Sequence, residues 1–303
     1  MHFNKILWAT DGSDESGEAL KYVRLIADRY NSVVVALSVI EPVDFAMLGV
    51  PPEVQRELIS TQLVIERKEY ERMVRALSEI GISGDRRVIR VEAGIPYEEI
   101  IRVSEEEGVD LIVMGKRGLG IKDRILLGSN TIKVLRTVRI PVLAVRRREG
   151  YGENVEVRKI LVPTDLSEVT RASLKIASDL ALKFNCPTVY LLHVVELRHH
   201  YELSPPSIIE SLERHALIKL RAYIEEVGEE YRSLDFQERV SFSLSAWHSV
   251  VEFAGQEGID LIVMPTHGRK GILGLILGSV AEKVINEAPC PVLAIKSQTA
   301  ISQ

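Results

Sequence analysis

Short apolar runs rich in β-branched residues alternate along the chain with stretches in which apolar residues recur at helical spacing. The runs predict strands at 5–9, 32–40, 87–92, 111–114 and 142–145, then at 159–162, 189–195, 238–244, 261–264 and 292–295. Between them, positions such as Leu20, Val23 and Tyr30 repeat every three or four residues, which is typical of amphipathic helices. The run at 111–114 is apolar throughout, which indicates a strand buried on both faces and hence a parallel sheet covered by helices. We therefore predict an α/β fold made of two doubly wound, five-stranded parallel sandwiches.

The order of elements occurs twice because the sequence itself is duplicated. Lys-Ile-Leu-x-x-Thr-Asp ends at Asp11 and again at Asp165, and Pro-Val-Leu-Ala opens a final strand in each half. A repeat of this length indicates two domains, each large enough to bury its own core. We expect one domain at 1–147, a polar linker at 148–157 and a second domain at 158–303.

A glycine-spaced loop is the clearest repeated motif after the strands. Its first copy has Gly115 and Gly118, then nine residues, then Gly128 and Ser129. Each copy leaves an apolar strand and enters a helix, so that unpaired backbone N–H groups and a positive helix end face a common point. A phosphate is the natural ligand for such a loop. The alternatives are that the glycines only serve turns and that the serine only caps the helix.

The second copy differs at its first position. It has Pro265 where the first copy has Gly115, and continues with Gly268, Gly278 and Ser279. Proline has no N–H and a fixed φ, so the second loop is a weaker candidate for an anion. The sequence from Ser279 to Glu282 also has the spacing of a capping box, which favours a structural role for Ser279. A second weak site and a degenerate one both stay open.

Three features of the first half meet at the carboxyl ends of the predicted strands. Asp11 follows the first strand, Val39 lies near the end of the second, and the glycine loop follows the fourth. In open α/β sheets, ligands bind beyond these ends where the strand order reverses. The alternative for Asp11 is a turn or cap before the helix that begins near Ser13.

With these motifs placed together, the chain resembles the universal stress protein family along essentially its whole length. The resemblance implies a site for an adenine nucleotide, ATP or AMP, with any Mg²⁺ held by the phosphates and water. It implies that Asp11 contacts the ribose or adenosine portion and that the Val39 backbone recognises the adenine edge. It places the phosphates among Gly115, Gly118, Gly128 and Ser129. Extra positive charge around the loop is expected from Lys116, Arg117, Lys122 and Arg124.

The same motifs identify the residues of the second half that correspond to the expected nucleotide-site residues of the first. They are Asp165, Val194, Gly268, Gly278 and Ser279. The second half also has Leu244 and Ala246 where the first has Gly94 and Pro96, and together with Pro265 these departures put nucleotide binding there in doubt.

Composition and charge exclude several other classes. A net charge of −5 gives no reason to expect nucleic-acid binding, and no apolar run approaches the length of a membrane span. Met1 to Lys5 runs straight into a strand, so we expect no signal peptide and a cytoplasmic protein. Cys186 and Cys290 each precede a proline and are expected to be buried thiols without a disulfide. His199 and His200 are adjacent on a polar stretch, and we expect no metal site there.

We expect a binding or switch protein of the stress response rather than an efficient enzyme. The sequence shows no hydrolase triad order, zinc-protease motif or Walker lysine, so no catalytic residue is assigned. A slow ATPase or autophosphorylating enzyme and a non-binding dimerisation module are the alternatives. The resemblance further implies that the edge strands Val142–Val145 and Val292–Ile295 pair antiparallel into an internal pseudo-dimer, through which two chains can associate further. The signalling partner is not identified by the sequence.

Overall fold

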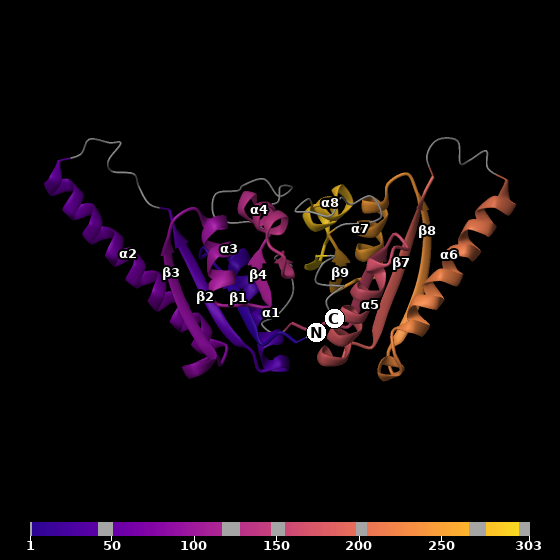
Figure 1. Ribbon diagram of the computed structural model, residues 1–303, viewed down its shortest axis with the longest axis horizontal. Helices are drawn as coiled ribbons and strands as arrows, with labels where there is room; N and C mark the ends of the chain where they lie inside the picture. Colours follow the sequence, from indigo (N-terminus) through magenta and orange to yellow (C-terminus); the bar gives the residue numbers. More distant parts are fainter. Residues whose placement is uncertain are drawn as a thin grey trace.

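Ten strands build the molecule, and the structure, a computed structural model, describes them within residues 2–41, 51–116, 128–146, 155–197, 205–266 and 277–296. The first half holds β1 (Lys5–Ala9), β2 (Val33–Ile40), β3 (Arg87–Ala93), β4 (Leu111–Gly115) and β5 (Val142–Val145). The second half holds β6 (Lys159–Thr164), β7 (Thr188–Glu196), β8 (Asp235–Ser243), β9 (Leu261–Pro265) and β10 (Val292–Ile295). They form one sheet in the order β3-β2-β1-β4-β5-β10-β9-β6-β7-β8 (Figure 1). Within each half all strand pairs are parallel, as predicted.

Helices connect the strands. They are α1 (Asp14–Tyr30), α2 (Pro52–Glu79), α3 (Pro96–Glu106) and α4 (Ser129–Thr137), then α5 (Val169–Phe184), α6 (Pro206–Glu226), α7 (Ala246–Gln256) and α8 (Ser279–Glu287). Local sequence explains the ends of α1. Ser13 caps the start by accepting a hydrogen bond from the Ser16 N–H, and Asn31 ends the helix in the left-handed conformation at φ 54°. Asn185 ends α5 in the same way at φ 55°.

The helices cover both faces of the sheet. One core cluster joins α1, α2, α5 and α6 to residues such as Trp8, and the other joins α3, α4, α7 and α8 to residues such as Leu7. The side chains of neighbouring residues in β1 thus pack on opposite faces of the sheet, because side chains alternate along a strand. Both clusters continue from one half into the other. The doubly wound arrangement predicted from the sequence is confirmed.

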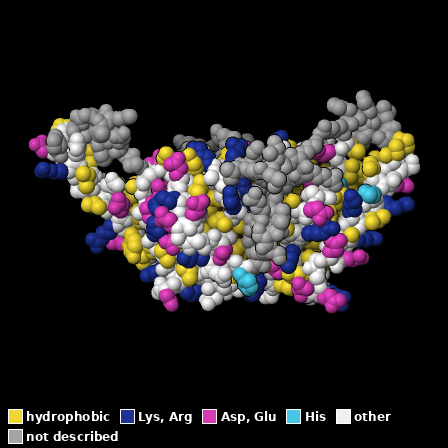
Figure 2. Space-filling model, viewed as in Figure 1, with side chains coloured by type: hydrophobic (Ala, Val, Ile, Leu, Met, Phe, Trp, Pro, Cys, Tyr) yellow, Lys and Arg dark blue, Asp and Glu magenta, His cyan; other side chains and the backbone are white. Residues whose placement is uncertain are grey.

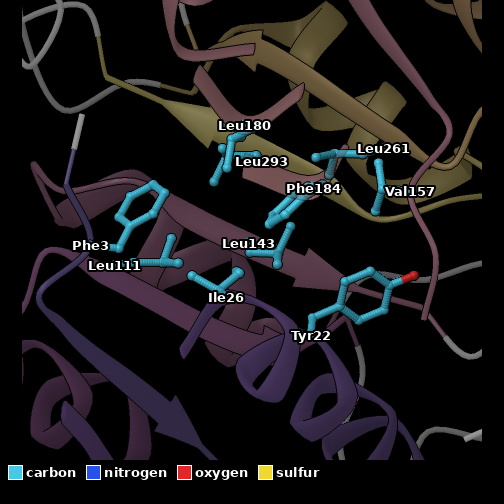
Figure 3. A pocket seen from close by; sticks show the side chains of 10 residues that line it. All are labelled: Phe3, Tyr22, Ile26, Leu111, Leu143, Val157, Leu180, Phe184, Leu261 and Leu293. Atoms are coloured by element: carbon cyan, nitrogen blue, oxygen red, sulfur yellow. The ribbon is translucent and has the colours of Figure 1, made fainter. Parts of the chain in front are cut away.

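The two halves meet where β5 and β10 pair antiparallel. Leu143 lies opposite Leu293 in this pair, and both side chains are buried. The expected internal pseudo-dimer is therefore present within one chain. On the α1 and α5 side of the pair, apolar side chains including Phe3, Tyr22 and Phe184 surround a cavity of about 10 Å³ (Figure 3). So small and apolar a space is a packing defect at the junction rather than a binding pocket.

The strand that departs furthest from its predicted bounds is β8. β8 begins at Asp235, three residues before the expected start at 238, and it ends at Ser243. Leu244 was expected to end the strand, but it follows the strand and is 70% exposed. β8 is an outer strand whose side chains are half-buried or exposed, so charged residues such as Arg239 interrupt the apolar pattern that a buried strand shows. The division into 1–147, 148–157 and 158–303 stays a prediction.

The outer helices α2 and α6 extend past the ends of the sheet (Figure 1). They expose apolar side chains, among them Ile59 and Leu63 on α2 and Ile218 on α6, which contribute to the hydrophobic surface along both ends of the molecule (Figure 2). In the described part of the chain, none of the helices combines the length and the apolar character that a membrane span needs.

Candidate functional site

The strand order reverses at β1, which lies between β2 and β4. Ala9, the last residue of β1, pairs with Leu37 on one side and Met114 on the other. The carboxyl ends of three strands therefore meet at one rim of the sheet. Asp11 follows β1, Val39 lies in β2 and Gly115 ends β4, so the structure brings these three sequence-predicted residues to the same rim.

Asp11 lies in a tight turn between β1 and α1. Its Oδ1 accepts a hydrogen bond from the Ser13 N–H at 3.0 Å, and the Thr10 hydroxyl accepts one from the Gly12 N–H at 3.3 Å. Gly12 has φ 78°, a conformation that glycine adopts without steric cost. Asp11 thus has the turn role named as its alternative, while its side chain is exposed at the rim. The two roles are compatible.

The main chain of Val39 faces the same turn. The Leu37 carbonyl accepts from the Thr10 N–H at the end of β1, whereas the Ile40 carbonyl accepts from the Gly94 N–H on the β3 side. Alternate residues of a strand direct their main-chain groups to the same neighbour, so Val39 directs its own toward β1. Because β1 has already ended, these groups lie above the Asp11 turn rather than beside a strand.

The N-terminus of α4 completes this rim. Gly128 is the N-cap residue and Ser129 is the first helical residue, with its side chain exposed. The Gly128 N–H donates to the Lys116 carbonyl at 2.8 Å, and the Thr131 hydroxyl donates to the Gly115 carbonyl at 3.1 Å. These bonds place the start of α4 against the end of β4. Gly118, Arg117, Lys122 and Arg124 lie outside the described residues.

The capping interpretation of the serines is wrong. The N-cap residues are Gly128 and Gly278, neither of which can offer a side-chain acceptor, so Ser129 and Ser279 stand one position inside their helices. Glu282 therefore does not close a capping box. Its carboxylate instead forms a 2.9 Å ion pair with Arg136 at the end of α4, across the junction between the halves.

Lys116 also departs from expectation. Its side chain does not add charge to an exposed loop but is buried, with 2% of the residue exposed. The ammonium group crosses the junction and donates to the Ala288 carbonyl at 3.1 Å and the Cys290 carbonyl at 3.5 Å. Ala288 caps the C-terminus of α8, where a positive charge is favourable. Lys116 therefore stabilises the junction.

A charged pair on α2 was missed by the sequence prediction. Glu69 and Arg72 form an ion pair of 2.7 Å, the Ser38 hydroxyl donates to Glu69 at 2.9 Å, and Arg72 donates to the Thr10 hydroxyl at 3.3 Å. Burial favours a raised pKa for Glu69, but the hydrogen bonds from Arg72 and Ser38 and the charge of Arg72 outweigh it, so the pKa is lowered. The sequence offers only an i,i+3 pair on a helix, which is usually solvated, and no signal that it reaches the rim.

The second half repeats the turn but changes its surroundings. Ser167 N–H donates to Asp165 at 3.0 Å and Leu166, at φ 63°, takes the place of Gly12. The Tyr223 hydroxyl contacts this turn by donating to the Leu166 carbonyl at 2.9 Å. His193 stands one residue before Val194, and its Nδ1 lies 2.9 Å from the Thr164 carbonyl.

The second loop begins at Pro265, the last residue of β9, and returns at Gly278, whose N–H donates to the Thr266 carbonyl at 2.8 Å. Its two ends therefore meet as those of the first loop do. Gly268 lies outside the described residues.

The described residues contain neither a candidate metal site nor a disulfide. They contain no group of three or more His, Cys, Asp or Glu side chains placed to hold a metal ion. Cys186 and Cys290 are buried free thiols, as expected, and burial raises the pKa of Cys186 to about 11. A thiol with so high a pKa is largely protonated and unreactive near neutral pH. His199 and His200 lie outside the described residues.

Comparison with known proteins agrees with the duplicated fold. A universal stress protein of Methanocaldococcus jannaschii is 36% identical over 146 residues, which cover 48% of this chain and 83% of that protein. One from Mycolicibacterium smegmatis is 24% identical over 295 residues, 96% of both chains. The crystal structure of a universal stress protein from Archaeoglobus fulgidus has the same fold, with a TM-score of 0.66 at 21% identity over 97% of both chains.

The family assignment rests on both halves separately. The sequence pattern of the universal stress protein family matches residues 2–146 and again residues 156–296. The repeated strand order, the paired glycine loops and these two matches lead to one conclusion: the chain belongs to the universal stress protein family, as a tandem member with a family domain in each half.

Proposed function

We propose that the first half binds an adenine nucleotide, ATP or AMP, and that the protein acts in the stress response as a nucleotide-dependent switch or protective binding module. The observation that carries this proposal is the common rim formed by the Asp11 turn, the Val39 main chain and the N-terminus of α4. A carboxylate, an open strand edge and a helix N-terminus match, in that order, a ribose, a base edge and a phosphate. We keep 1–147 and 158–303 as the proposed domains, joined by 148–157.

Each group has a distinct task in this site. The exposed Asp11 carboxylate accepts hydrogen bonds from ribose hydroxyls, and the Val39 N–H and carbonyl pair with the adenine edge. At the start of α4 the backbone N–H groups have no partner within the helix, so they and the Ser129 hydroxyl donate to phosphate oxygens. Gly115, Gly118 and Gly128 let the backbone approach the anion closely. A Mg²⁺ ion arriving with ATP is held by the phosphates and water.

The second half is a weaker site or none. Asp165, Val194, Gly278 and Ser279 hold the corresponding positions, but Pro265 removes a backbone donor at the start of the loop that contains Gly268. The neutral Tyr223 hydroxyl at the Asp165 turn stands in contrast to the charged Glu69–Arg72 pair at the Asp11 turn.

A matched pair of variants tests this assignment. Asp11→Asn keeps an acceptor for the turn but removes the charge, and we expect ATP affinity to fall about tenfold or more, as for loss of a hydrogen bond to a charged group. Asp165→Asn makes the same change in the other half and is expected to leave the affinity unchanged. Calorimetric titration of the full chain with ATP and with AMP measures both.

The outcomes separate the alternatives. Absence of binding to the unmodified protein contradicts a nucleotide-binding function and leaves the dimerisation module. Equal losses in the two variants contradict the assignment to the first half. Phosphate release per bound ATP, followed over hours, then distinguishes a switch from a slow ATPase, and incorporation of labelled phosphate into the chain detects autophosphorylation.

A further inference from the structure

A guanidinium group lies against the Asp11 turn of the first half. We propose that Arg72 is a positioning residue, which sets the place and electrostatic surroundings of the Asp11 carboxylate and so tunes the affinity of the first half for the ribose of its nucleotide. This inference rests on the proposed nucleotide site and assigns part of its specificity to α2, a helix that supplies none of the residues predicted for that site.

Arg72 reaches the turn from α2, which covers the same face of the sheet as α1. Its Nη1 donates to the Thr10 hydroxyl at 3.3 Å, and that same oxygen accepts from the Gly12 N–H. A Cβ at Gly12 would lie 3.6 Å from the Arg72 Cζ, so the guanidinium packs directly against residue 12. Asp11 stands between the two residues that Arg72 touches.

Glu69 fixes the direction of this guanidinium. It accepts from Arg72 Nη2 at 2.7 Å and from Nε at 3.2 Å, a two-point contact that holds the planar group in one orientation. Glu69 also accepts from the Ser38 hydroxyl, and Ser38 directly precedes Val39. One ion pair on α2 therefore joins the end of β1 to the end of β2, the two strands proposed to hold adenosine.

Because its members are charged, the Glu69–Arg72 ion pair does more than hold α2 against the sheet. Asp11 and Glu69 are both carboxylates near the same turn, and like charges repel, so the charge of Asp11 acts to raise the pKa of Glu69. Arg72 lies against both the Asp11 turn and Glu69 and offsets this repulsion. Without it, Asp11 is expected to turn away from Glu69 and from the rim, where the ribose is proposed to bind.

In the second half the same turn forms with a tyrosine hydroxyl, not a guanidinium, donating to it. There the Leu166 N–H donates to the Thr164 hydroxyl at 2.9 Å and the Ser167 N–H donates to Asp165, the same two bonds as in the first half. The Tyr223 hydroxyl makes the contact from α6, to the Leu166 carbonyl. In the second half the Arg171 guanidinium lies over the Tyr223 ring, 5.0 Å from its centroid, whereas in the first half the guanidinium of Arg72 donates directly to the turn. The distinct feature of the first half is therefore this direct charged contact.

A titration with nucleotides that lack one ribose hydroxyl tests this role. Arg72→Gln is compared with the unmodified full chain by calorimetry, using ATP, 2′-deoxy-ATP and 3′-deoxy-ATP. We expect ATP affinity to fall about tenfold, as for weakening one hydrogen bond to a charged group. For the deoxynucleotide that lacks the hydroxyl bound by Asp11, the same substitution is expected to change affinity by less than about twofold, because coupled groups are non-additive.

Three further variants complete the design. Arg67→Gln on the same helix removes an exposed arginine paired with Glu71 and is expected to change nothing. Tyr223→Phe removes the contact to the second turn and is expected to leave ATP binding unchanged. Arg72→Lys keeps the charge and is expected to retain most of the ATP affinity. Thermal unfolding of each variant confirms that it is folded.

Each outcome bears on one claim. Equal loss with all three nucleotides indicates a purely structural ion pair and overturns the inference, as does an unchanged ATP affinity in Arg72→Gln. A loss in Arg72→Lys as large as in Arg72→Gln contradicts the role of charge. If the unmodified chain binds none of the nucleotides, the proposed function itself fails, a result distinct from the others.

Discussion

Two buried lysines cross the junction between the halves in opposite directions. Lys116 of the first half donates to the Ala288 carbonyl at the end of α8, and Lys296 of the second half lies 3.4 Å from the Arg136 carbonyl in the last turn of α4. Each ammonium group thus meets the negative end of a helix from the other half. The helices that these lysines contact, α4 and α8, begin at Ser129 and Ser279, the last residues of the two glycine loops.

Lys296 gives the junction a defined pH dependence. Burial lowers its pKa to about 8 in the folded state, from an ordinary value of 10.5. Between these values the unfolded chain binds the extra proton, so the contribution of Lys296 to stability rises from pH 8 to about 10.5. Methionine does not titrate. We therefore expect the unfolding free energy of the unmodified protein to increase relative to Lys296→Met over this range.

Urea unfolding of both proteins at pH 7, 8, 9 and 10 measures this difference. A difference that is constant across the series, or that changes in the opposite direction, contradicts the burial of a charged Lys296 at the junction.

At the scale of elements, β5 and β10 join the halves although each has only four residues. Every residue of both strands is buried, and the core on each face continues across them. Short strands suffice here because helices on both faces contribute to the same clusters. The halves are therefore expected to unfold as one cooperative unit.

Leu143→Ala tests this continuity. Leu143 lies opposite Leu293 in the β5–β10 pair and borders the small junction cavity, so its truncation enlarges a space that the rigid sheet cannot close. We expect a loss of about 2–5 kcal/mol in unfolding free energy, with a single transition retained. Leu244→Ala, at a residue that is 70% exposed, is the control and is expected to change stability by at most about 0.5 kcal/mol. Separate transitions for the two halves are the contrary result.

The elements were predictable from the sequence because their apolar periodicity is strong. β1, β5 and β10 have the predicted bounds, because β5 and β10 are apolar throughout and β1 is apolar after Lys5. The predicted start of β8 was three residues too late because this outer strand carries charged residues, which interrupt the apolar pattern. The paired edges followed from the family resemblance, whereas the positions of Ser129 and Ser279 relative to their caps depend on backbone angles that residue types do not determine.

The candidate site was predictable only in part. Motifs at strand ends identified Asp11 and Val39, because parallel strands bring their carboxyl ends to one rim. Lys116 was misassigned because its neighbours in the chain are loop residues, whereas its neighbours in space belong to the other half. Glu69 and Arg72 were missed because contact between a helix and a distant turn depends on how the helix lies over the sheet.

At the scale of the whole molecule, a nearly symmetric fold carries two unlike rims. The same turn, strand ends and helix start occur in both halves. The Glu69–Arg72 ion pair contacts the turn of the first half, whereas Tyr223, His193 and Pro265 lie at the corresponding places in the second. Duplication therefore explains the fold, and divergence at the rims explains the expected difference in binding. We therefore expect one high-affinity nucleotide site per chain, in the first half.

Calorimetric titration of the unmodified protein, Gly118→Val and Gly268→Val with ATP measures this difference between the two halves. We expect one high-affinity ATP per unmodified chain, loss of that binding in Gly118→Val, and high-affinity binding like that of the unmodified protein in Gly268→Val. Thermal unfolding shows whether each variant is folded. Two sites of equal affinity per chain, or loss of binding in Gly268→Val but not in Gly118→Val, would contradict a nucleotide site confined to the first half.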